Sequence, residues 1–114
     1  MNKLVIYTVR DRLAGDSSLI LTAKNEPILR RNIKGVLLSK QQNFINTDTP
    51  DKEIYESGYI DTDTGKIVGL ENPVFVVNVE ELRQELISEI RQKQAEAGIP
   101  ENPQKEDLPD GGNN

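Results

Sequence analysis

Short blocks of apolar residues alternate with polar stretches along the chain, and their spacing predicts both strands and helices. The β-branched and aromatic run at residues 4–9 predicts a strand that is covered on both faces. Residues 19–22 predict a second, shorter strand, and residues 74–77, which follow Asn72 and Pro73, predict another buried strand. Three strands are therefore expected from these runs, two near the N-terminus and one just before residue 78.

Residues 53–69 have the clearest local pattern in the chain, and it predicts a β-hairpin. Because side chains alternate along a strand, Ile54 and Ile60 are expected on one face and Tyr55 and Tyr59 on the other. The turn is expected at residues 61–65, where an Asp side chain can accept backbone N–H groups and Gly65 can take a positive φ. Residues 66–68 then return as the partner strand.

Two helices are expected. Asn25, Glu26 and Pro27 are typical of a helix start, and a helix to about Lys40 would bury the stripe formed by Leu29, Ile33, Val36 and Leu37. Gly35 in its middle either marks close packing against the sheet or only weakens the helix.

A second helix is expected from Val79 to about Ala97. Asn78 and Glu81 have capping-box spacing, and Leu82, Leu86 and Ile90 recur at every fourth residue. Gly98 suits the position just beyond the helix end.

These elements predict an α+β domain over residues 1–98, with a small, mostly antiparallel sheet and two helices on one face. At 114 residues the chain has room for one small core. Residues 99–114 contain three prolines, several acids and two glycines, and they predict a flexible acidic tail.

Composition argues against most catalysis. The chain has no cysteine and no histidine, which excludes disulfides and thiolate chemistry and removes the commonest general base and metal ligand. Asp61 and Asp63 begin like a calcium loop, but Gly65 and Asn72 stand where the fifth and twelfth ligands are needed. We therefore expect no enzyme, no cofactor and no metal site.

The expected compartment is the cytosol, with no membrane partner. No apolar run approaches the roughly 20 residues that span a bilayer, and the N-terminus lacks the layout of a signal peptide.

Charge is distributed unevenly. The net charge of -5 comes from residues 1–40, with eight Lys or Arg against three acids (+5), and residues 41–114, with six against sixteen (-10). The positive part contains the candidate phosphate contacts, and the hairpin contains two candidate stacking rings at i and i+4. These candidate nucleic-acid-binding residues are Arg10, Arg12, Arg30, Arg31, Lys34, Tyr55 and Tyr59. The plainer interpretation is a solvated helix face for the cations and a core face for the tyrosines.

The chain also resembles a known family, the small nonstructural proteins of gokushoviruses, which are single-stranded-DNA phages of the Microviridae. The likeness covers about residues 4–70 and rests on Tyr7-Thr8-Val9-Arg10-Asp11, Asn25-Glu26-Pro27, Arg30 or Arg31, Asp51, Ile54-Tyr55, Gly58-Tyr59, Asp61 and Thr64-Gly65. It implies a noncatalytic protein of the infected bacterial cytoplasm, absent from the virion, that binds single-stranded DNA during replication or packaging. The resemblance further implies that Arg10, Arg30 and Arg31 contact the DNA backbone and that Tyr55 and Tyr59 stack on bases.

A protein-interaction module is the alternative. The second helix, the hairpin edge or the acidic tail could bind a viral or host protein or a second copy of the chain. The net charge favours this alternative, whereas the +5 segment and the family resemblance favour DNA.

Overall fold

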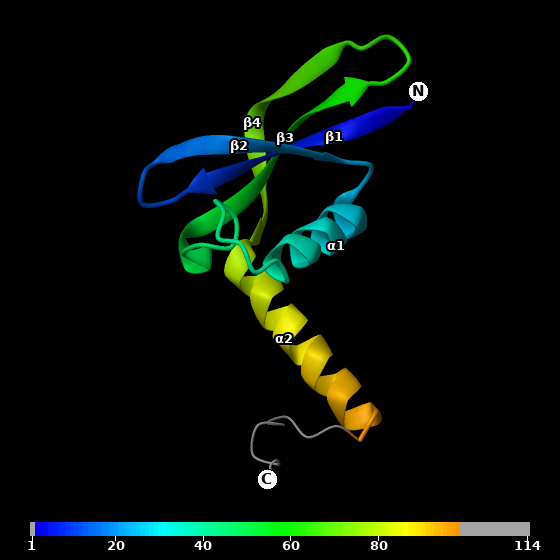
Figure 1. Cartoon of the computed structure of the whole chain (residues 1–114). Coiled ribbons are helices and arrows are strands. Elements are labelled where there is room, and N and C mark those ends of the chain that lie inside the picture. Colours follow the sequence, from blue (N-terminus) through cyan, green and yellow to red (C-terminus); the bar gives the residue numbers. More distant parts are fainter. Residues whose placement is uncertain (1, 99–114) are drawn as a thin grey trace. The chain divides into compact units, whose positions relative to one another are not determined.

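The computed structural model describes residues 2–98 and has an α+β fold (Figure 1). The elements in chain order are β1 (Lys3–Asp11), β2 (Asp16–Ala23), α1 (Glu26–Leu37), the short 3-10 helix η1 (Thr49–Asp51), β3 (Lys52–Asp61), β4 (Ile67–Asn78) and α2 (Val79–Glu96). The four strands form one antiparallel sheet in the order β2-β1-β3-β4. The predicted fold class is confirmed for these residues, and the predicted acidic tail lies outside them.

The chain divides into two units, residues 1–83 and residues 84–114. The first contains the whole sheet, α1 and the first turn of α2. No helix in residues 2–98 is long and apolar enough to cross a membrane.

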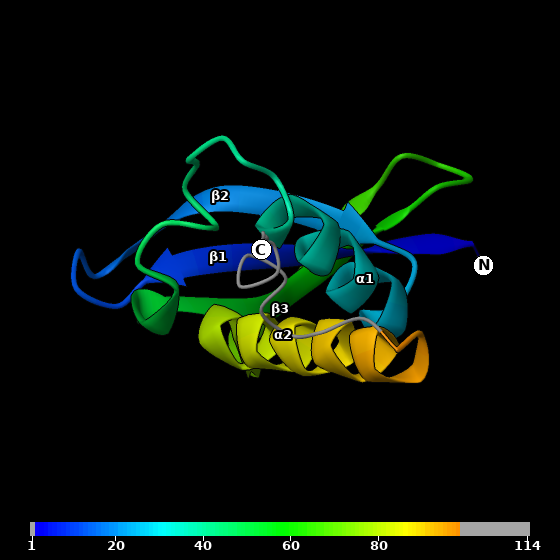
Figure 2. The same ribbon diagram turned by 60° about the horizontal axis from the view of Figure 1, so that its bottom comes forward.

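The core lies on one face of the sheet, between the strands and α1 (Figure 2). Its most deeply buried side chains come from every layer of the first unit: Tyr7 and Val9 of β1, Ile54 of β3, Leu29 and Ile33 of α1, and Val79 and Leu82 of the first turn of α2. Burial of these apolar side chains is the main stabilising term of so small a domain. We call this the core face of the sheet.

Both helices begin where the sequence predicts. The side-chain oxygen of Asn25 accepts the backbone N–H of Ile28 at 3.0 Å, and that of Asn78 accepts the N–H of Glu80 at 2.7 Å. α1 ends at Leu37, a few residues before the predicted end. A methyl group added at Gly35 would meet nothing within 4 Å, so this glycine does not mark close packing against the sheet.

The cap of α1 yields a first prediction. Asn25→Ala removes an acceptor from an otherwise unpaired helix N–H and should lower the free energy of unfolding by about 1 kcal/mol. Asn32→Ala, at an exposed position within the same helix, is the control and should be neutral or slightly stabilising. Urea unfolding of both variants measures the difference, and equal losses would contradict the capping role.

β4 corrects one expectation. Residues 67–78 form one continuous strand at the sheet edge, with Pro73 inside it, rather than a short return strand followed by a separate buried one. Val74 and Phe75 are 56% and 50% exposed, and only Val77 of the predicted buried run is in the core. An edge strand tolerates proline because its missing N–H can face away from the neighbouring strand.

Candidate nucleic-acid interface

The face of the sheet opposite the core carries the candidate site, and strand register defines which residues lie on it. Residues directly opposite each other in an antiparallel pair point to the same face. Thr8 pairs with Ile20 on one side and Tyr55 on the other, Arg10 pairs with Ser17, and Tyr55 pairs with Phe75. These positions alternate with the buried Tyr7 and Val9, so they share the opposite face, which we call the open face.

In residues 2–83 the helices pack on the core face, which leaves the open face to strands alone. Ile20 is 68% exposed there and Phe75 50%. The two side chains lie on the outer strands β2 and β4, in one cross-strand row with Thr8 and Tyr55 between them.

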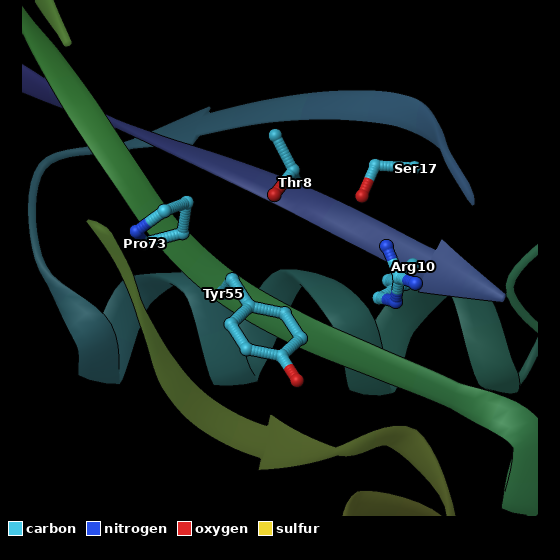
Figure 3. A pocket seen from close by; sticks show the side chains of 5 residues that line it. All are labelled: Thr8, Arg10, Ser17, Tyr55 and Pro73. Atoms are coloured by element: carbon cyan, nitrogen blue, oxygen red, sulfur yellow. The ribbon is translucent and has the colours of Figure 1, made fainter. Parts of the chain in front are cut away.

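A groove of about 260 Å³ runs over this face. Its lining comes from all four strands, as Figure 3 shows: Thr8 and Arg10 from β1, Ser17 from β2, Tyr55 from β3 and Pro73 from β4. The groove thus combines the phenol ring of Tyr55, a guanidinium and the hydroxyls of Thr8 and Ser17, which are the kinds of group that bind a base, a phosphate and a sugar.

Tyr55 is held in place by its neighbours. Its ring meets the ring of Phe75 edge to face, with centroids 5.6 Å apart and planes at 78°. Its hydroxyl donates to a carboxylate oxygen of Glu53 at 3.2 Å. Burial, and then the nearby charge of Glu53, raise the pKa of the Tyr55 hydroxyl, so it keeps its proton and the hydrogen bond persists at neutral pH.

Arg10 supplies the cation of the groove. Among residues 2–98 no carboxylate forms an ion pair with its guanidinium, although Glu53 is its cross-strand neighbour. A guanidinium on a strand, without a carboxylate partner, is placed to contact a phosphate with several donors.

Tyr59 is not part of this surface, because a β-bulge at Ser57 reverses the alternation of β3. Ile6 pairs with Gly58 whereas Tyr7 pairs with Glu56, so Ser57 is the extra residue. Beyond the bulge, Tyr59 pairs with Val5, which packs against the core. The expectation that Tyr55 and Tyr59 share a face is therefore wrong.

A hydrogen bond joins the bulge residue Ser57 to Thr8 of the open face. The hydroxyls of Thr8 and Ser57 lie 2.8 Å apart and hydrogen-bond across the two central strands. Tyr59, on the other face, has the ammonium of Lys3 4.8 Å from its ring centroid.

The cations predicted on the first helix also lie away from the open face. Leu29 and Ile33 turn one side of α1 to the core face, so Arg30, Arg31 and Lys34 belong to the helix-covered side of the sheet. Arg30 also forms a salt bridge with Glu26 at 2.9 Å. Arg12, just beyond β1, forms one with Asp51 at 2.9 Å.

Of the seven predicted site residues, Arg10 and Tyr55 are thus brought together in the groove. The structure adds Thr8, Ser17, Pro73 and the neighbouring Phe75, which sequence reasoning missed. The sequence pattern places Phe75 in a buried strand, because a run of apolar residues looks the same at a sheet edge as in a core. Within the described residues, no cluster of three acidic side chains could hold a metal ion.

Comparison with known proteins identifies a protein family. Residues 4–82, which include all of the sheet except Lys3, α1 and the first turn of α2, match the model of the family described as Phage ORF5 protein. No curated protein and no solved structure matches the chain.

Proposed function

The chain belongs to the Phage ORF5 protein family, and from that premise we propose that it is a noncatalytic phage protein that binds single-stranded DNA with the open face of its sheet. The observation that carries the proposal is the Tyr55–Phe75 ring pair beside Arg10, on a face that the helices within residues 2–83 leave uncovered. Unpaired bases expose their flat surfaces, and aromatic side chains on a sheet bind them by stacking without regard to sequence.

The chemistry of the groove supports a binding role over a catalytic one. Its polar groups are the arginine, the hydroxyls of Thr8 and Ser17 and the phenol of Tyr55, with no histidine or cysteine anywhere in the chain to act as base or nucleophile. The resemblance to gokushovirus nonstructural proteins supports a finer proposal. The protein acts in the cytoplasm of the infected bacterium during DNA replication or packaging, and it is absent from purified virions.

Salt dependence tests the phosphate contact. Affinity for oligo(dT) should fall log-linearly as salt rises from about 50 mM, and Arg10→Gln should make the slope shallower by about 0.7, the value for one lost single-strand phosphate contact. Arg12→Gln is the matched control, because Arg12 is paired with Asp51 outside the groove, and its slope should stay that of the wild type. Wild-type protein that binds no oligo(dT) at low salt would refute the proposal.

Binding to a phage or host protein is the second candidate, and the exposed Ile20 and Phe75 on the open face favour it. An apolar protein contact depends weakly on salt, whereas counterion release makes DNA binding steeply salt-dependent. A complex with a purified protein partner that survives high salt, and is lost in Phe75→Ser, would support this candidate over the first.

A further inference from the structure

Basic side chains on α1 and just before it form a charged surface that is separate from the open face. Arg31 lies two residues from both Leu29 and Ile33, and at 100° per residue it points away from the core that these two enter. Arg31 is exposed, as is Lys24 just before the helix cap, and Lys34 follows Arg31 by one turn. We call Lys24, Arg31 and Lys34 the α1 basic face.

The charge of this segment stands out from that of the whole protein. Residues 24–40 carry five Lys or Arg and one Glu, giving 5 - 1 = +4, within a chain of net charge -5. The only carboxylate of α1, Glu26, is bonded to Arg30 rather than to Arg31. The α1 basic face therefore presents a local positive field that attracts a polyanion.

This face and the open face lie on opposite sides of the sheet. The open face is one surface of the sheet, and the α1 basic face lies beyond a helix of about 10 Å diameter that covers the other surface. Two nucleic-acid segments could therefore occupy the two surfaces of one molecule without colliding.

The two surfaces also differ in chemistry. The open face offers rings, which need unpaired bases, whereas the α1 basic face consists of a lysine just before the helix cap and an arginine and a lysine on α1. Charge alone favours the duplex, since its backbone carries a phosphate charge for about every 1.7 Å of helix axis.

We propose that the protein bridges single-stranded and duplex DNA, with the open face holding the single strand and the α1 basic face holding the duplex backbone. The single-strand half of this inference rests on the proposed function. The duplex half rests on α1 alone, so the two can fail separately.

A bridging assay tests it. Biotinylated oligo(dT) on beads is loaded with full-length protein, washed, and mixed with a fluorescent duplex, which should be retained only when protein is present. Lys24→Gln/Arg31→Gln should lower duplex retention by at least about tenfold, because each lost phosphate contact lowers duplex affinity several-fold at physiological salt. The same variant should bind oligo(dT) within about twofold of the wild type.

Arg12→Gln/Lys66→Gln is the charge-matched control, since both residues belong to residues 2–83 and lie outside α1, and it should retain duplex like the wild type. Protein that binds the beads but retains no duplex would overturn bridging, as would an equal loss in the control or unchanged retention in Lys24→Gln/Arg31→Gln. If oligo(dT) binding itself fails, bridging and the proposed function both fall. A titration of Tyr55→Ala with duplex alone then decides whether the α1 basic face binds DNA by itself.

Discussion

Tyr55→Ala is expected to weaken binding of an unpaired oligonucleotide by about tenfold to a hundredfold at low salt. A base stacked on an aromatic side chain contributes about 1–3 kcal/mol, and each 1.4 kcal/mol is a factor of ten in affinity. Tyr55 also orients Phe75 through their edge-to-face contact, so removal of one ring disturbs the other. Fluorescence anisotropy with labelled oligo(dT) measures the change, and Tyr55→Phe should keep most of the affinity because it keeps the ring.

Tyr59→Ala is the matched control for this prediction. It removes the same side chain from the same strand, but from the core side of the sheet, beyond the bulge at Ser57. Its affinity for oligo(dT) should stay within about twofold of the wild type. Equal losses in the two variants would mean that the bulge does not separate the tyrosines functionally, and the open face would no longer explain binding. Thermal unfolding of each variant must be compared first, so that a loss of folding is not read as a loss of contact.

Gly58→Ala is expected to be the most destabilising small substitution in the hairpin. A methyl group at Gly58 would lie 2.3 Å from the carbonyl oxygen of Val68 and 3.0 Å from the Cα of Gly69, and both are backbone atoms. Backbone atoms in a paired strand cannot yield as the end of a flexible side chain can, so β3 and β4 would have to separate locally. We expect a loss of about 1–3 kcal/mol in the free energy of unfolding, the usual cost of overpacking.

Gly69→Ala provides the comparison. Gly69 is the cross-strand partner of Gly58, yet a methyl group there meets nothing within 4 Å. This variant should be neutral or stabilised by up to about 1 kcal/mol, because alanine reduces the conformational freedom of the unfolded chain. Urea unfolding of the two variants side by side should show a large difference. Similar stabilities would contradict the close approach of the strands at Gly58.

The helix starts and the hairpin turn can be predicted from the sequence, because the residues that determine them are close together in the chain. Asn25 and Asn78 cap the two helices through bonds to residues two or three positions away. Gly65 has φ of +79°, as the hairpin turn requires. Such features depend on a few neighbouring residues, so a pattern of caps, turns and apolar blocks predicts them.

Which face of the sheet each strand residue occupies is harder to predict from the sequence, because it depends on how the strands pair. The single extra residue Ser57 reverses the alternation of β3, and no period-two pattern reveals where the reversal falls. The available signal is Gly58, since glycine inside a strand often marks a bulge or a close approach of backbones. A bulge placed there separates Tyr55 from Tyr59.

The candidate site is half predictable for the same reason. Residue type singles out Arg10 and Tyr55, but their neighbours depend on which strands are adjacent and which face is covered. Arg31 has the right charge, and helix periodicity alone places it away from the core, but only the position of α1 over the core face shows that it lies across the sheet from Tyr55.

The central claim is that single-stranded DNA lies on the open face. Photocrosslinking tests this claim most directly. Oligo(dT) containing 5-iodouracil, bound to the full-length protein and irradiated, links to aromatic side chains that stack on its bases. Mass spectrometry of the linked peptides should find Tyr55 and Phe75. Links at Tyr59 or Phe44 in their place, or a complex that forms without a link to either open-face ring, would contradict the account.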